Sequence, residues 1–193
     1  MLAIVLIVGG YQFYFFPQKR TIFRSREFFN KIDERIPFYP SLIWVYSGLY
    51  YPIIIVLVLT IDNFRTFNYT AFNFIILLTV HLLFFFLFPV QVPNSWRDVE
   101  IDNSLSVRFL RFVHSYDGRS NCFPSMHVSV ATLTSLHLIR NLQDSYGDIV
   151  ILFYLFPVLI AFSCVFTKQH YIIDIPAGAL LGYGSYALWI SIV

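Results

Sequence analysis

The sequence predicts an all-α integral membrane protein, built as a six-helix bundle in a single domain that covers residues 1–193. Of these residues, 58% are hydrophobic and only 12% are charged, whereas soluble proteins average about 25% charged residues. Apolar runs of about 20 residues, long enough to cross the hydrocarbon core of a bilayer, recur along the chain. The net charge of +2, with no basic run outside the connections, argues against a nucleic-acid partner.

Six apolar runs are assigned as membrane spans. The first, 1–16, is short, but it has neither a basic start nor a small-residue cleavage site, so we interpret it as a span rather than a signal peptide. The other five are 41–61, 71–90, 123–139, 149–166 and 171–193. With six spans, the connections after the first, third and fifth lie on the same side of the membrane.

The connection 17–40, between the first two spans, contains apolar residues that fall on one helical stripe: Phe28, Phe29, Ile32 and Ile36. This stripe predicts an interfacial helix that lies flat on the membrane. The connections 62–70 and 141–148 are predicted as turns. The long polar connection 91–122 is expected to carry function, because long connections in compact domains usually do.

A polar island, 166–174, stands between the last two spans. If the last helix begins near His170, the four-residue spacing places His170 and Asp174 on one face, where the carboxylate can orient the imidazole. Ionisable groups at the edge of a membrane span are costly and therefore indicate a functional site. A structural His–Asp pair at the interface is the alternative.

The fourth span opens with Asn121-Cys122-Phe123-Pro124-Ser125-Met126-His127. Proline is favoured at the first helical position, and Asn121 or Cys122 falls where a cap is expected. A helix that begins here would present the backbone N–H groups of residues 125–127, and the positive end of its dipole, to an anion.

His127 is a second imidazole on the same side of the membrane as His170. The cations that can reach this side are Arg97, Arg119 and Lys168. Phosphoryl transfer depends above all on stabilising negative charge, so this combination predicts a phosphate site. A metal site built from His127, His170 and Asp174 is the main alternative, although Lys168 and Arg119 would repel a divalent cation.

Structural roles are predicted for the remaining histidines and for the cysteines. The histidines are His81, His114 and His137, of which His114 lies in the long connection near the candidate site. Cys122 and Cys164 provide neither a disulfide framework nor metal-ligand spacing and are interpreted as buried thiols.

The motif Asn121-x-Phe-Pro-Ser-Met-His127, followed 43 positions later by His170-x-x-x-Asp174, resembles the type-2 phosphatidic acid phosphatase superfamily. The segments 32–40 and 88–93 are similar to its inositol phosphorylceramide synthase-like branch. The resemblance covers nearly the whole chain and implies a membrane fold of six helices. It implies that His170 attacks phosphorus with its other ring nitrogen held by Asp174, that His127 protonates the leaving oxygen, and that Ser125 binds the phosphate.

The chain departs from the motifs of that superfamily at four places. If Arg97 is the arginine of the first motif, Val90 stands where a lysine is expected and Asp98 where a proline is expected. Met126 replaces the glycine of the usual Pro-Ser-Gly-His. Cys164 replaces an arginine that usually opens the third motif, and we expect Lys168 to supply the missing charge.

These observations predict a metal-independent enzyme without a cofactor, which hydrolyses a phosphomonoester or pyrophosphate lipid through a phosphohistidine at His170. A lipid hydroxyl in place of water would make it a phosphotransferase, and a lipid-binding protein without activity is the non-enzymatic alternative. We expect a multi-pass protein of a bacterial inner membrane or an endomembrane. Its orientation stays open: 11 of the 13 Lys and Arg residues lie on the histidine side, which favours the cytoplasm, whereas the resemblance implies the periplasm or lumen.

Overall fold

The computed structural model describes residues 12–18, 23–28, 30–98 and 103–192. Within these residues the chain forms α-helices and short 3₁₀ or π segments, and no β-strand. The prediction of an all-α fold is therefore confirmed for the described part of the chain. Of the first expected span, 1–16, only residues 12–16 are described, and they are helical.

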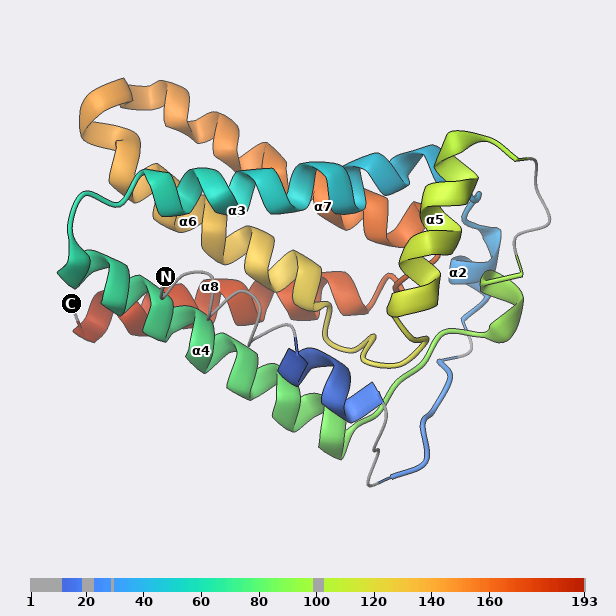
Figure 1. The fold of residues 1–193 in the computed structure, drawn as a ribbon. Coiled ribbons are helices and arrows are strands. Elements are labelled where there is room, and N and C mark those ends of the chain that lie inside the picture. Colours follow the sequence, from blue (N-terminus) through green and yellow to red (C-terminus); the bar gives the residue numbers. More distant parts are fainter. Residues whose placement is uncertain (1–11, 19–22, 29, 99–102, 193) are drawn as a thin grey trace.

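Four helical stretches are long and apolar enough to cross a membrane: Pro40–Leu59, Phe64–Leu87, Met126–Phe166 and Asp174–Ile192. The third contains α6 (Met126–Tyr146), the 3₁₀ segment η4 (Gly147–Tyr154) and α7 (Leu155–Phe166). The chain reverses at η4, so that α6 and α7 run side by side in opposite directions (Figure 1). The expected fourth and fifth spans both lie in this stretch, and the total of six spans stays a prediction.

Two predicted turns are largely helical. The helix α4 (Phe64–Leu87) begins seven residues before the expected span, because the side chain of Asn63 caps it by accepting a hydrogen bond from Thr66 N at 2.8 Å. At the other turn, α6 continues to Tyr146 and ends where Gly147 adopts a φ of 55°. Each of these two helix ends depends on a single residue, Asn63 for α4 and Gly147 for α6, and the hydropathy pattern does not reveal such a role.

The interfacial helix expected in residues 17–40 is not confirmed. Among the described residues 23–28 and 30–39, the only helix is α2 (Lys31–Arg35), which has five residues, and Phe29 lies outside the described residues. Phe28 turns inward and packs against Phe123 and Tyr171, at centroid distances of 5.9 and 5.6 Å. The apolar stripe is therefore broken by a tertiary contact.

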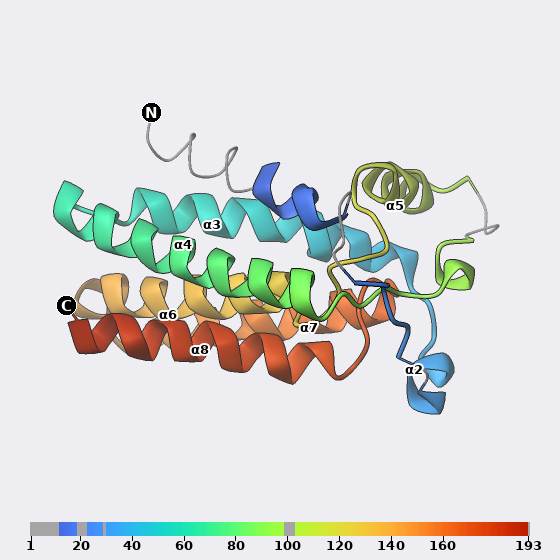
Figure 2. The ribbon, with the colours of Figure 1, turned by 90° about the horizontal axis from the view of Figure 1, so that it is seen from below.

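The connection 91–122 contains a helix that the sequence pattern did not reveal. This helix, α5 (Leu105–Tyr116), is capped by Ser104 and follows the 3₁₀ turn η3 (Asn94–Trp96). Figure 1 shows α5 crossing the end of the bundle, and Figure 2 shows it almost along its axis. It covers the end at which α6 and α8 (Asp174–Ile192) begin.

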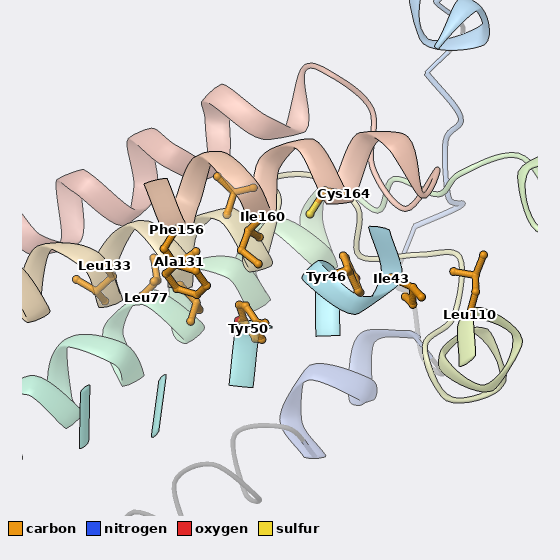
Figure 3. Packing of buried hydrophobic residues seen from close by; sticks show 12 residues of the cluster. Ile43, Tyr46, Tyr50, Leu77, Leu110, Ala131, Leu133, Phe156, Ile160 and Cys164 are labelled. Atoms are coloured by element: carbon orange, nitrogen blue, oxygen red, sulfur yellow. The ribbon is translucent and has the colours of Figure 1, made fainter. Parts of the chain in front are cut away.

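The core surrounds α6, which packs against α8, α7, α4 and α3 (Tyr50–Leu59). Figure 3 shows Ala131 of α6 beside Phe156 and Ile160 of α7, with Tyr50 of α3 facing them. The 3₁₀ turn η1 (Pro40–Leu42) and the π-helical segment η2 (Trp44–Leu49) precede α3 and bring Tyr46 toward the start of α6. This packing brings Tyr46 and His127 together at the end of the bundle where α6 begins.

Candidate active site

His170 lies in the loop 167–173, before the last helix, which begins at Asp174. The prediction that both residues share one helix is therefore wrong, yet their contact forms: His170 Nδ1 lies 3.2 Å from Asp174 Oδ2. The same nitrogen lies 2.8 Å from the carbonyl oxygen of Cys122. A carbonyl oxygen can only accept, so Nδ1 carries the proton and, in the neutral ring, Nε2 carries the lone pair.

The carboxylate of Asp174 is fully buried at the start of α8. Its Oδ2 also accepts a hydrogen bond from Tyr171 N at 2.9 Å, which fixes the turn between the histidine and the helix. Its Oδ1 is buried and has no hydrogen-bond partner within the described part of the chain. The backbone oxygen of Asp174 accepts from Ser125 N at 3.1 Å and so joins the starts of α6 and α8.

Ser125, and not Asn121 or Cys122, caps α6. Its hydroxyl accepts a hydrogen bond from Val128 N at 3.4 Å and is fully buried, 4.0 Å from the sulfur of Cys164. Asn121 instead has a φ of 65°, and its side chain donates to Tyr14 O at 2.8 Å. The predicted cap is wrong because the chain enters the helix later, after Pro124.

His127 lies in the first turn of α6 and faces His170, with the two ring centroids 6.2 Å apart. Its ring stacks on Tyr46 at a centroid distance of 4.2 Å, and Tyr50 lies 4.8 Å away. The Tyr46 hydroxyl is 3.2 Å from His127 Nδ1. Both imidazoles therefore have one nitrogen engaged by a fixed polar partner.

Arg97 is anchored by the loop that precedes α6. Its guanidinium donates to the backbone oxygens of Asp117 at 2.8 Å and Gly118 at 2.9 Å, while its Nε is buried without a partner among the described residues. Burial raises the pKa of Asp117, which also accepts from Gln18 at 2.8 Å. Burial, and to a smaller extent the Arg97 charge, lower the pKa of His114 to about 3.

Among the described residues, the structure shows no contact between Arg97, Arg119 or Lys168 and either histidine of the candidate site. Arg119 donates to Val92 O at 3.2 Å and lies 3.7 Å from the carboxylate of Glu27. Lys168 has a φ of 57°; its ammonium donates to Asp33 O and lies 4.8 Å from the ring centroid of Trp96. Burial lowers the pKa of Lys168, while the carboxylates of Asp33 and Glu34 raise it.

A family model described as the PAP2 superfamily matches residues 16–188. The chain belongs to the PAP2 superfamily. The match includes both histidine motifs, three of the four stretches that can cross a membrane and the fourth as far as residue 188, and it confirms the resemblance seen in the sequence. No curated protein and no solved structure matches the chain.

Membership of the PAP2 superfamily indicates phosphatase-type chemistry, and together with four apolar helical stretches it indicates an integral membrane protein. Between the two histidine motifs, Cys164 occupies the place of a usual arginine and is fully buried beside Ser125. Within the described residues, no group of three His, Cys, Asp or Glu side chains is arranged to hold a metal ion.

Sequence reasoning missed two residues that contact the groups of the candidate site. Tyr46, the partner of His127, lies in a π-helical segment, and such segments are frequent at functional sites but cannot be read from a hydropathy pattern. Asp33 is only 2% exposed in the short helix α2, and its Oδ1 accepts from Ile172 N at 2.8 Å. The segment 32–40 contributed to the resemblance alone, and no role for Asp33 followed from it.

The three histidines expected to be structural all have close polar partners. His81 lies 2.9 Å from both Leu77 O and the hydroxyl of Ser129. His137 Nε2 lies 3.2 Å from the amide nitrogen of Asn73, far from the PAP2 site. His114 is different, because its Nε2 lies 2.6 Å from the side-chain nitrogen of Gln169, the neighbour of His170.

Proposed function

We propose that this chain is a membrane lipid phosphate phosphatase that works through a phosphohistidine at His170. The observation that supports this most directly is the placement of His170 Nδ1 between two acceptors, the carbonyl of Cys122 and the carboxylate of Asp174. This arrangement keeps the proton on Nδ1 and leaves the Nε2 lone pair available as a nucleophile.

In the first step, His170 Nε2 attacks phosphorus, and the bond from phosphorus to the lipid oxygen breaks. His127 donates a proton to that oxygen, so the lipid alcohol leaves neutral. The phosphorylated imidazole keeps its Nδ1 proton and gains positive charge, which the buried carboxylate of Asp174 stabilises. In the second step, His127 takes a proton from water, and the water oxygen attacks phosphorus. The bond from phosphorus to His170 Nε2 breaks, and phosphate is released.

Tyr46 gives His127 the tautomer that this sequence of steps requires. When the Tyr46 oxygen accepts a hydrogen bond from Nδ1–H of His127, Nδ1 keeps its proton, and Nε2 is the nitrogen that gives up the proton of the imidazolium in the first step and takes one from water in the second. Stacking of the two rings at 4.2 Å restricts the imidazole to one orientation. Nε2 of His127 is then the general acid, paired with the nucleophile across 6.2 Å between ring centroids.

We assign phosphate binding to Arg97, Arg119, Ser125 and Lys168, with Arg97 as the main cation. Its two anchoring hydrogen bonds, to residues 117 and 118, fix the guanidinium on the loop that leads into α6. The ammonium of Lys168 and the guanidinium of Arg119 already donate to backbone oxygens, so a phosphate has to share them with those acceptors.

The second candidate is a lipid phosphotransferase that uses the same two histidines. It is favoured by the burial of His170, which is only 5% exposed, because exclusion of water lets a lipid hydroxyl act as the acceptor. Release of inorganic phosphate from a phosphorylated lipid, measured with and without an added lipid alcohol, separates the two. A phosphatase releases phosphate in both cases, whereas a transferase gives a phosphorylated acceptor only with the alcohol.

The test of the proposal is His170→Ala in the purified protein, assayed in detergent against a set of phosphorylated lipids. Loss of the nucleophile is expected to lower turnover by at least about 1000-fold, while the thermal unfolding transition stays in place. His127→Ala is expected to slow phosphorylation of His170 by about 100-fold or more. Turnover in His170→Ala comparable with the wild type, or complete loss of wild-type activity in a chelator, contradicts the proposal.

A further inference from the structure

The helix α5 (Leu105–Tyr116) has one buried side and one exposed side, and both sides carry large apolar residues. On the inner side, Val107 is 1% exposed and Leu110 is 0% exposed, with Leu110 in the same core cluster as Ile43. On the outer side, Leu105, Phe112 and Tyr116 are 72%, 57% and 64% exposed. Exposed clusters of large apolar side chains usually indicate a surface that is covered by another protein or by the membrane.

The depth of α5 in the membrane follows from its contact with the first described span. Trp44 Nε1 donates to Ser106 Oγ at 3.1 Å, and the Trp44 ring lies 4.8 Å from that of Phe109. Trp44 is four residues beyond Pro40, where the span begins, which corresponds to about 6 Å along a helix axis. Tryptophan favours the boundary between headgroups and acyl chains, so α5 packs at that level.

The orientation of α5 suits this position. Figure 1 shows α5 running across the end of the bundle, and Figure 2 shows it end-on while the spanning helices are seen from the side. A helix placed in this way at the level of Trp44 lies in the plane of the interface. Its exposed side therefore meets lipid rather than bulk water.

The exposed side of α5 also carries Arg108 and Arg111, three residues apart, and the helix contains no Asp or Glu. Arg111 also donates to Asn103 Oδ1 at 3.5 Å, just before the helix begins. Cations beside exposed Leu, Phe and Tyr form the composition of helices that bind anionic membrane surfaces.

We propose that the outer side of α5 is embedded in the membrane interface and binds the headgroups of anionic phospholipids. Arg108 and Arg111 contact the phosphate groups, and Leu105, Phe112 and Tyr116 enter the acyl region. His114, on the same helix, contacts Gln169 next to His170, so the bound lipid lies one helix away from the candidate active site. This inference does not depend on the proposed function.

The first experiment measures the depth of α5 with the protein reconstituted in nanodiscs. A fluorophore on Phe112→Cys is expected to be quenched by a spin label on the acyl chains and not by iodide in the water. The matched control is Glu34→Cys in the exposed helix α2, where iodide is expected to quench. The unsubstituted protein corrects for labelling of Cys122 and Cys164, which are both buried.

Iodide quenching at Phe112→Cys places the outer side of α5 in water and overturns the proposal. Protection from both quenchers also overturns it, because a protein surface, such as a second copy of the chain, then covers the helix.

The second experiment tests the preference for negative charge, with spin-labelled phosphatidylglycerol and phosphatidylcholine as the probes. The wild type is expected to immobilise more phosphatidylglycerol, and Arg108→Gln with Arg111→Gln is expected to reduce the ratio of the two toward one. The control is Arg65→Gln, whose guanidinium lies 5.8 Å from the Tyr69 ring on α4 and is expected to leave the ratio unchanged. Equal immobilisation by the wild type, or no effect of the double substitution, contradicts the proposal. Neither readout requires the protein to turn over a substrate.

Discussion

Replacement of Gly182 by alanine is expected to disrupt the packing of α8 on α6. A Cβ at this position would lie 2.4 Å from the backbone oxygen of Ser129 and 2.9 Å from the Cβ of Thr132. At Gly178, one turn earlier, it would lie 2.5 Å from the backbone oxygen of Ser125. Glycines four residues apart allow this close approach of two membrane helices, and a backbone oxygen cannot move aside as a flexible side chain can.

The size of the effect follows from two opposing terms. Overpacking typically costs about 1–3 kcal/mol, and contact with a backbone atom places Gly182→Ala at the upper end, about 3 kcal/mol. The better helix propensity of alanine offsets about 1 kcal/mol, so the net loss is about 2 kcal/mol. Gly184 lies on the same helix with open space around it, and Gly184→Ala is expected to gain up to about 1 kcal/mol.

Equilibrium unfolding in mixed detergent micelles measures both variants against the wild type. The two substitutions make the same chemical change on one helix, so their difference of about 3 kcal/mol, more than 100-fold in the unfolding constant, isolates the close contact. If Gly182→Ala is as stable as the wild type, or if Gly184→Ala loses as much stability, then α6 and α8 do not pack as closely as these distances require.

Three further predictions concern groups around the candidate site. Asp33→Ala leaves the backbone N–H of Ile172 without its acceptor, and an unsatisfied buried donor costs about 1–3 kcal/mol. Amide hydrogen exchange in 167–173 is therefore expected to accelerate. Substitution of the exposed neighbour, Glu34→Ala, is expected to leave this exchange unchanged. Tyr46→Phe removes the polar partner of His127 and is expected to reduce kcat about tenfold with little change in KM, equivalent to about 1.4 kcal/mol; an unchanged kcat excludes this role. The pKa of His114 is about 3 in the folded protein, against an ordinary value of 6.5, so folding favours its neutral form, and stability is expected to fall as pH decreases from 6.5 toward 3. Unfolding midpoints at neutral and acidic pH measure this loss, and His114→Gln should reduce it.

The contact between His170 and Asp174 was predicted correctly from an incorrect local structure. The sequence argument assumed one helical face, whereas the residues are joined by a turn in which Tyr171 N and His170 Nδ1 both meet Asp174 Oδ2. A separation of four residues brings side chains together in a helix and also in the turn that leads into one. The prediction therefore did not depend on where the helix begins.

The long-range contacts could not be predicted, because periodicity reports only on neighbours along one element. The apolar residues of α5 are spaced for burial, but only the fold shows that Leu110 reaches the core beside Ile43. In the same way, the apolar stripe in the connection 17–40 predicted an interfacial helix, although Asp33 in that connection is buried against Ile172, 139 positions away. Each contact joins segments whose proximity depends on the packing of the intervening spans.

The replacement of an arginine by Cys164 has a different significance once these contacts are known. Cys164 Sγ lies 4.0 Å from Ser125 Oγ. An arginine at position 164 would therefore place its positive charge near Ser125, the cap of α6, and this charge is what the chain lacks. The sequence argument assigned its replacement to Lys168, but the ammonium of Lys168 donates to Asp33 O and braces the loop that carries the proposed nucleophile. Arg97 is held at the entrance to α6 by two backbone oxygens and retains a buried Nε without a partner in the described part of the chain. We therefore infer that Arg97 supplies most of the charge for phosphate, and that Lys168 contributes mainly by holding His170 in place.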